Sequence, residues 1–284
     1  MRVGSEVLPN QEDCMFVSVI IPAYRKEKTI QKNVRHIYEA LLETRYEFEI
    51  ITVVDGTSLD ATFSEVKKFR RENVSVVGYE RNRGKGYAIR YGMARAKGEF
   101  IAFIDAGMEI EPNGISMILE HMQWYNADII VGSKRHPASK VKFPFIRQIY
   151  SYGYHFIVRI LFRLNVRDTQ SGLKVYKRKV LEDVLPRLVV KEFAFDVELL
   201  VVANHLGYRR IYEAPIEVDL SSYKDSSTFK SFLFLDPMIR NMFMDTLGIF
   251  YRLYILRYYD TGNKRRWVYD SELDMRVNTG ESSK

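Results

Sequence analysis

The sequence predicts an α/β fold in which a mainly parallel β-sheet is covered by helices on both faces. Two observations predict it. Through the first half of the chain, short β-rich apolar runs alternate with segments of helical periodicity, which is typical of parallel sheets. Aspartates and glycines follow several of these runs, where parallel sheets bind ligands. The chain is long enough for one large domain or two fused halves.

Each element follows from its local pattern. The run FVSVIIP at 16–22 is apolar and β-branched, and the next segment places Ile30, Val34 and Ile37 on one helical face. The run YEFEIITVV at 46–54 predicts the second strand, which ends at the break DGTS. By the same criteria, strands are expected at 16–22, 46–54, 74–79, 100–105 and 128–132, and helices at 30–42, 60–71, 87–96 and after Pro112.

The second half has a different pattern. Residues 145–164 and 229–259 are rich in aromatic and aliphatic residues interrupted by charges, which is typical of amphipathic helices that lie in a membrane interface. Packing on the core or at a dimer contact is the alternative. We expect an N-terminal tail at 1–15, a main domain at 16–220 divided at residue 135, interfacial helices at 221–260, and a polar, mobile tail at 261–284.

The positive charge is concentrated in the middle of the chain. The net charge is +7, and residues 134–191 hold 14 Lys and Arg against 3 Asp and Glu. Such a block favours an anionic partner, whether a phosphorylated substrate or an acidic lipid surface, although a solvated face has the same composition. No nucleic-acid recognition motif accompanies it, so we expect no nucleic-acid partner.

The sequence shows neither a recognisable secretory signal nor a membrane-spanning stretch. The first fifteen residues contain no apolar core of a secretory signal, and the single Cys14 cannot form an intramolecular disulfide, which fits a reducing compartment. The longest uncharged stretch of the aromatic-rich middle, 148–158, is shorter than the roughly 20 residues that span a bilayer. We therefore expect a peripheral membrane protein. The sequence leaves the oligomeric state open.

Three strand ends carry groups suited to a nucleotide ligand. Asp55 could accept hydrogen bonds from a base edge, or cap a turn. The glycines of the loop 83–86 (RGKG) let the backbone approach an anion, with Lys85 supplying charge. Asp105, with Glu109 four residues later, could hold Mg²⁺ or Mn²⁺ through hard oxygen ligands.

Other site classes are not supported. The loop 83–86 is not a P-loop, and no GxGxxG follows the first strand. The five histidines are scattered, so neither a zinc site nor a Ser-His or Cys-His catalytic pair is predicted.

With these residues in view, the chain resembles family 2 glycosyltransferases of the GT-A fold, a Rossmann-like nucleotide-sugar-binding sheet. The resemblance spans roughly 16–258. Its motifs are VSVIIPAYRKE (17–27), VVDGTSLDAT (53–62), NRGKGYAIRYGMARAKGEFIAFIDAG (82–107) and VGSKR (131–135). In the second half, YSYGYHFIV (150–158), RDTQSGLKVYKR (167–178) and FAFDVELL (193–200) are similar to dolichyl-phosphate β-glucosyltransferases and, less closely, to dolichyl-phosphate mannosyltransferases.

The resemblance implies roles for particular residues. The nucleotide side would be formed by Pro22, Tyr24, Glu27, Asp55, Lys85 and Asp105. Ser133 and Arg135 would face the diphosphate or the acceptor phosphate, and Gln170, Ser171 and Asp168 would line the reaction site. Asp196 would lie in the sugar or acceptor pocket, and Asp168, Asp196 and Arg135 are the catalytic candidates.

The sequence departs from the family at the metal motif. The family's Asp-Ala-Asp is Asp105-Ala106-Gly107 here, and VVDG stands where VVDDGS is common. Either Glu109 replaces the missing ligand, or metal binding is weak, or the protein is a degenerate relative that binds nucleotide sugars without turnover.

The resemblance therefore implies an inverting hexosyltransferase at the cytoplasmic face of a membrane. UDP-glucose is the favoured donor and a polyprenyl or dolichyl phosphate the acceptor, with a divalent metal as cofactor. The alternatives are a GDP-mannose-dependent enzyme, a transferase with a soluble or protein acceptor, and the metal-impaired binding protein.

Overall fold

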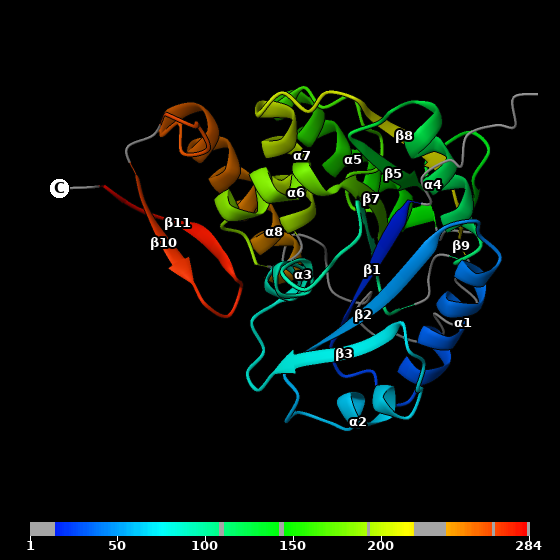
Figure 1. Ribbon diagram of the computed structural model, residues 1–284. Coiled ribbons are helices and arrows are strands. Elements are labelled where there is room, and N and C mark those ends of the chain that lie inside the picture. Colours follow the sequence, from blue (N-terminus) through cyan, green and yellow to red (C-terminus); the bar gives the residue numbers. More distant parts are fainter. Residues whose placement is uncertain are drawn as a thin grey trace, which may run out of the picture.

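The fold is built on a seven-stranded sheet (Figure 1). A computed structural model describes residues 15–107, 111–141, 145–191, 194–218, 237–262 and 265–282. Within them the strand order is β3-β2-β1-β4-β7-β5-β8. The strands are β1 (Phe16–Ala23), β2 (Glu47–Asp55), β3 (Val74–Tyr79), β4 (Phe100–Ile104), β5 (Ile129–Ser133), β7 (Leu173–Lys177) and β8 (Ile211–Pro215). All neighbours are parallel except β7, which is antiparallel to β4 and β5, so the predicted fold class is confirmed.

Helices cover both faces of the sheet because its strands are apolar on both sides. One core cluster, which includes Val19, Ile37 and Ile118, lies under the helices α1 (Ile30–Leu42), α2 (Thr62–Lys67) and α4 (Gly114–Trp124). The opposite cluster, which includes Ile20 and Leu199, lies under α3 (Lys85–Met93), α5 (Phe145–Phe162), α6 (Arg178–Val184), α7 (Phe195–His205) and α8 (Pro237–Phe250). Two layers of helices therefore hold the sheet between them.

Strand β7 is one of several elements after residue 132 that sequence periodicity did not predict. It lies antiparallel between β4 and β5, with Leu173 opposite Ile104. Because the chain enters β7 at the edge where β4 ends, Gly172 lies directly beside Asp105. This insertion places the RDTQSG motif at the carboxyl edge of the parallel strands.

The two aromatic-rich segments form helices that pack on each other. α5 and α8 are joined by a hydrogen bond between Tyr154 Oη and Thr246 Oγ1 (2.8 Å) and by Phe162 against Phe250. α8 continues into the π-helical turn η4 (Tyr251–Ile255). None of the described helices combines the length and apolar composition that a bilayer crossing needs. Residues 221–236 of the predicted interfacial segment and the predicted domain boundary at residue 220 lie outside the described residues.

The C-terminal segment holds an antiparallel hairpin of β10 (Arg265–Asp270) and β11 (Met275–Ser282). Leu273 in its turn is buried, and Tyr258 Oη donates to the carbonyl of Asn278 (2.9 Å). This ordered hairpin replaces the mobile tail that the polar composition suggested. A further two-stranded sheet joins β6 (Lys140–Val141) to β9 (Glu217–Val218).

Candidate active site

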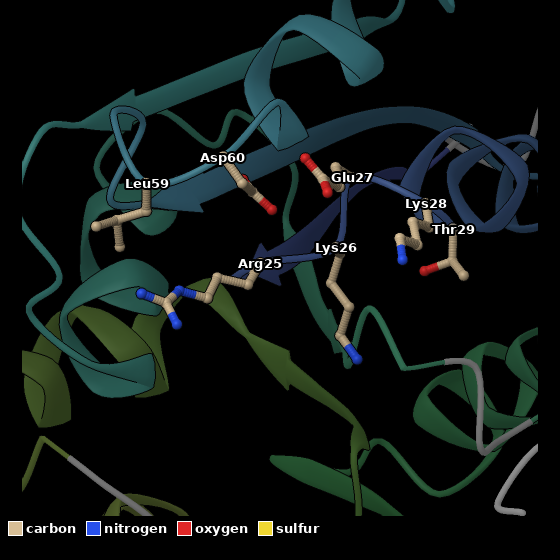
Figure 2. A pocket seen from close by; sticks show the side chains of 7 residues that line it. All are labelled: Arg25, Lys26, Glu27, Lys28, Thr29, Leu59 and Asp60. Carbon is tan, nitrogen blue, oxygen red and sulfur yellow. The ribbon is translucent and has the colours of Figure 1, made fainter.

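A shallow hollow opens where β1 ends, close to the β2–α2 connection (Figure 2). It has a volume of ≈ 680 Å³ and is lined by Arg25, Lys26, Glu27, Lys28, Thr29, Leu59 and Asp60. Three of these side chains are cationic, which suits an anionic ligand. Figure 2 shows the Arg25 and Lys26 side chains projecting away from the chain into open space.

The residues predicted to bind the nucleoside differ in their exposure to solvent and in their hydrogen bonds. Pro22 lies within β1 and is half-buried, whereas Tyr24 just beyond it is 44% exposed. Glu27 accepts a hydrogen bond from the Ala61 amide (3.1 Å), and the Lys26 amide donates to Thr62 Oγ1 (2.8 Å). Glu27 therefore connects the loop after β1 to the loop after β2 beside the hollow.

Asp55 organises the Gly-rich loop. One of its carboxylate oxygens accepts from the Arg83 amide (2.7 Å), and the other from the Gly84 amide (2.9 Å) and Asn82 Nδ2 (3.1 Å). The carboxylate is only 4% exposed. The structure thus places Asp55 as the internal anchor of residues 82–84, the turn-capping alternative of the sequence analysis.

Two glycines give this loop its path. Gly84 has φ 89°, a conformation that favours glycine, and it immediately precedes α3. A Cβ on Gly86 would lie 2.5 Å from the Phe195 ring, so the loop can approach α7 only without a side chain there. The RGKG and FDVELL motifs are therefore in direct contact, and Lys85 between the glycines reaches the second motif.

Four charged side chains form one cluster at the carboxyl edge. Lys85 Nζ lies 2.9 Å from Asp105 Oδ1 and 3.1 Å from Asp196 Oδ2. Lys174 Nζ lies 2.6 Å from Asp196 Oδ1 and donates to the Ser171 carbonyl (2.6 Å). We call Lys85, Asp105, Lys174 and Asp196 the charge cluster. It contains two cations and two anions, and so is neutral overall.

Burial and pairing shape the pKa values in this cluster. Burial alone would raise the pKa of Asp196, but the Lys174 and Lys85 ammonium groups hold it below its ordinary value. Burial would lower the pKa of Lys85, but Asp105 and Asp196 raise it well above its usual range. Burial lowers the pKa of Lys174 in spite of Asp196. Asp196 is therefore a permanent carboxylate at neutral pH.

Asp105 is the member of the cluster that faces solvent, with 49% of its side chain exposed. It lies against the backbone of Gly172, whose carbonyl accepts from the Asp105 amide (3.0 Å). A Cβ on Gly172 would lie 2.4 Å from Asp105 Oδ2. The glycine of the RDTQSG motif therefore makes room for the Asp105 carboxylate.

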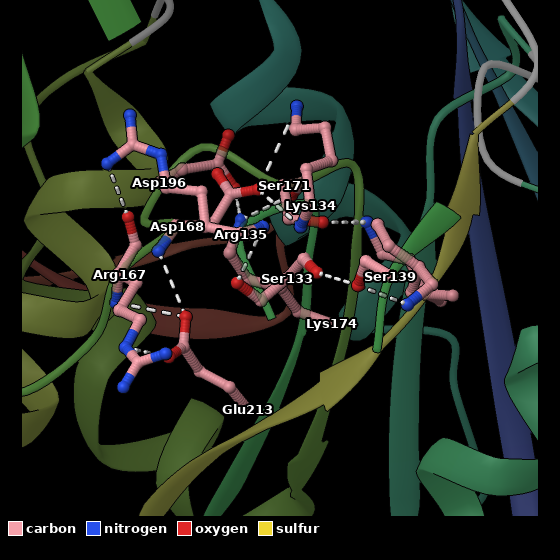
Figure 3. A network of polar contacts seen from close by, with 12 residues as sticks. Ser133, Lys134, Arg135, Ser139, Arg167, Asp168, Ser171, Lys174, Asp196 and Glu213 are labelled. Carbon is pink, nitrogen blue, oxygen red and sulfur yellow. Dashed lines mark hydrogen bonds and ion pairs between the residues drawn. The ribbon is translucent and has the colours of Figure 1, made fainter. Parts of the chain in front are cut away.

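A second polar network lies at the end of β5 (Figure 3). Asp168 Oδ2 accepts from the Lys134 amide (2.9 Å), and Arg135 Nη1 donates to the Arg167 carbonyl (2.8 Å). Glu213 Oε1 accepts from the Arg167 and Asp168 amides (2.9 and 3.0 Å). These contacts fix the turn after β5 against the RDTQSG motif.

The remaining predicted residues connect this network to its surroundings. Ser133 is buried, its hydroxyl accepts from the Arg135 amide (3.2 Å), and its carbonyl accepts from Ser139 Oγ (2.6 Å). Ser171 is buried and contributes its carbonyl to Lys174. Gln170 Nε2 lies 3.1 Å from Met242 Sδ on α8. Burial lowers the pKa of Arg135 despite the nearby Asp168.

The described residues include one of the two predicted metal ligands, Asp105. They contain no group of three or more His, Cys, Asp and Glu side chains that could hold an ion, and Glu109 lies outside them. Mg²⁺ is commonly held by one or two carboxylates together with substrate phosphates and water. The exposed Asp105 at the sheet edge fits this mode, in which the ligand supplies most of the coordination.

Two important residues were not singled out from the sequence. Lys174 is fully buried in β7, and the signal was a lysine inside the apolar run LKVY. Glu198 is also fully buried; it accepts from the Val189 and Val190 amides (2.9 and 2.8 Å) and from Tyr259 Oη (2.6 Å). In the FDVELL motif, the aspartate thus joins the charge cluster and the glutamate anchors the surrounding chain.

The sheet order and the charged carboxyl edge define a GT-A type of nucleotide-sugar-binding fold. The same fold is present in glucosyl-3-phosphoglycerate synthase from Mycobacterium tuberculosis in complex with UDP (TM-score 0.61, 16% identity, 93% of this chain and 87% of that chain). Mannosyl-3-phosphoglycerate synthase from Rubrobacter xylanophilus is also similar (TM-score 0.63, 13% identity, 91% and 84%).

The chain belongs to the family described as glycosyl transferase family 2, whose model matches residues 18–185. It is 35% identical over 223 residues to a dolichyl-phosphate beta-glucosyltransferase of Drosophila melanogaster, covering 72% of this chain and 68% of that protein. It is 32% identical over 256 residues to another, of Trichomonas vaginalis, covering 85% and 75%. The resemblance inferred from the motifs is confirmed, and the protein is a glycosyltransferase.

Proposed function

We propose that the protein transfers glucose from UDP-glucose to a polyprenyl phosphate of the dolichyl type at a membrane surface, with inversion at the anomeric carbon. The names of the similar proteins from Drosophila and Trichomonas support this acceptor and sugar. The M. tuberculosis synthase crystallised with Mn²⁺, UDP-glucose and phosphoglyceric acid (TM-score 0.59, 16% identity, 93% of this chain and 86% of that chain) supports a uridine nucleotide and a divalent metal.

One observation supports the proposed lipid acceptor. The polar site at the end of β5 is in contact with both amphipathic helices, α5 and α8. The Arg135 guanidinium lies 4.8 Å from the centre of the Tyr152 ring on α5, and Gln170 contacts Met242 on α8. An acceptor with an anionic head and an apolar chain matches a basic, polar site that borders apolar helices. A soluble acceptor does not need this border.

The helices expose apolar side chains that suit a bilayer interface. On α5, Tyr152, Phe156 and Ile160 recur every four residues and are 59–63% exposed. On α8 and η4, exposed side chains include Phe243, Met244, Leu247, Tyr251, Tyr254 and Ile255. Insertion of these faces to the depth of the headgroups would attach the protein without a spanning helix. The cytoplasmic face of the membrane is part of this proposal.

The chemistry follows from the charges present. A phosphate monoester is largely ionised near pH 7, so its oxyanion can attack the anomeric carbon without a strong general base. Asp168 accepts a hydrogen bond from the Lys134 amide, and Asp196 is paired with two ammonium groups. Both carboxylates would therefore position the sugar and stabilise positive charge at the anomeric carbon rather than abstract a proton. Lys85 and Arg135 supply the positive charge that offsets repulsion between diphosphate and acceptor phosphate.

A divalent metal held by Asp105 and the diphosphate would stabilise the leaving group as a Lewis acid. Glu109 remains the proposed second ligand. Position 107 is glycine, so the protein contributes fewer carboxylates than the family's usual motif.

A direct assay tests the proposal. Purified protein is incubated with dolichyl phosphate, Mg²⁺ or Mn²⁺, and UDP-glucose, and the lipid product is identified by mass spectrometry and its anomeric configuration by NMR. We expect a β-linked glucosyl lipid from UDP-glucose and no product from GDP-mannose. Transfer to water-soluble acceptors alone, or UDP-glucose binding without turnover, contradicts it. Flotation with anionic liposomes tests the membrane contact separately.

A further inference from the structure

The C-terminal hairpin contacts the Gly-rich loop through the carboxylate of Glu272. Glu272, in the turn between β10 and β11, forms an ion pair with Arg83 and accepts from Tyr87 Oη (2.6 Å). Its carbonyl also accepts from Arg95 Nη1 (3.4 Å). Residues separated by 189 positions in sequence thus meet beside the Gly-rich loop.

The turn that carries Glu272 is itself fixed. Asp270 Oδ1 accepts from the amides of Glu272 (2.9 Å) and Leu273 (3.1 Å), an Asx-type turn. The Leu273 side chain is 2% exposed, and Trp267 lies under the Arg187 guanidinium (5.2 Å to the ring centre). The Glu272 carboxylate is therefore presented to the loop from a rigid support.

Glu272 and Asp55 hold the loop through different groups. Asp55 holds the backbone amides of Arg83 and Gly84, whereas Glu272 holds the Arg83 side chain. The Arg83 guanidinium also lies over the Tyr87 ring, 4.6 Å from its centre. The backbone and the side chain of Arg83 are thus held by different partners. Arg83 lies two positions before Lys85 of the charge cluster.

We propose that Glu272 is a positioning residue for donor binding, which holds Arg83 and Tyr87 so that the Gly-rich loop 82–86 presents Lys85 to the donor diphosphate. The inference rests on the proposed nucleotide-sugar function. An exposed ion pair adds little to global stability, so the value of this contact lies in the geometry of the loop.

Binding of UDP to the full-length protein, measured by isothermal titration calorimetry, tests this inference. E272Q keeps the size of the side chain and removes its charge, and D274N makes the same change at an exposed carboxylate of the same turn that contacts Tyr269 within the hairpin. We expect E272Q to weaken UDP binding by about fivefold or more, the lower end of typical couplings between sites. D274N is expected to bind UDP as the wild type does.

Three further measurements distinguish a positioning role of Glu272 from a general loss of structure. E272Q should keep the wild-type melting temperature and the wild-type KM for dolichyl phosphate, and its Arg83–Tyr87 amides should exchange hydrogen faster. Unchanged or tighter UDP binding by E272Q overturns the inference, as does an equal loss in D274N. Failure of the wild type to bind UDP would instead overturn the proposed function.

Discussion

Two regions of the candidate active site use carboxylates in opposite ways. In the Gly-rich loop, Asp55 is satisfied by backbone amides and an asparagine side chain, and it shapes the chain around it. In the charge cluster, Asp105 and Asp196 are paired with ammonium groups on flexible stems. Amide hydrogen bonds lock a backbone in place, whereas an ammonium group can move to a new anion. In the proposed function, the first region therefore shapes the loop and the second contacts the phosphates.

The largest effect is expected from Asp196→Ala, which removes the centre of the charge cluster. Lys174 would remain fully buried without its counter-charge, which typically costs about 3–5 kcal/mol. We expect such a loss in the free energy of unfolding by urea denaturation, and a decrease of about 100-fold or more in kcat. Glu182→Ala, an exposed acid on α6, is the control and should change stability by less than about 0.5 kcal/mol.

A double variant sharpens this prediction. Asp196→Leu with Lys174→Met replaces the buried pair by apolar side chains, so stability should recover relative to Asp196→Ala while activity stays low. Recovery of activity together with stability would show that the cluster is only structural.

Gly172→Ala should have the next largest effect on activity. The new Cβ would displace the Asp105 carboxylate, which lies too close to accommodate it. We expect a decrease of about 10- to 100-fold in kcat/KM, in line with a displacement of about 1 Å at a reacting group. The matched control is Gly153→Ala on α5, where a Cβ meets nothing within 4 Å. Equal activity of the two variants would contradict a role for Asp105.

Asp55→Asn should act on donor affinity more than on turnover. An amide has one acceptor oxygen instead of two, and its NH₂ group would face the Arg83 or Gly84 amide. We expect a weakening of UDP binding by about tenfold, which corresponds to the loss of one buried hydrogen bond at about 1.4 kcal/mol. Calorimetric titration with UDP measures it, and a decrease in kcat at saturating donor with unchanged affinity is the contrary result.

Glu198→Gln should lower stability with little effect on chemistry. Glu198 makes three hydrogen bonds but contacts no member of the charge cluster in the described structure. We expect a loss of about 2 kcal/mol in the free energy of unfolding and less than a twofold change in kcat. A large decrease in kcat in a folded variant would show that the FDVELL glutamate also serves the reaction.

The smallest effect is a pH dependence of stability. Because the folded-state pKa of Asp196 lies below its ordinary value of 3.8, its contribution is present above pH 3.8 and is lost as the pH falls through the folded-state pKa. Urea denaturation in a pH series should show that Asp196→Asn flattens this acid slope. An unchanged slope would mean that Asp196 is not paired in the folded protein.

Local signals in the sequence predict the alternation of strands and helices up to residue 132 and the groups Asp55, Lys85 and Asp105 near the strand ends. Apolar periodicity and strand-breaking residues are local signals, and the strand ends at one edge of a parallel sheet follow from them. The motifs also identified the family. The partners of these groups were not predictable in the same way.

The pairing of charges from distant segments depends on the packing of the whole fold. Asp196 pairs with Lys174, 22 positions away, because β7 enters the sheet antiparallel between β4 and β5. It pairs with Lys85, 111 positions away, because Gly86 lets the start of α3 pack against Phe195 of α7. The hairpin brings Glu272 to Arg83 across 189 positions. Such pairs depend on how distant segments pack, and no local pattern in composition or periodicity encodes that packing.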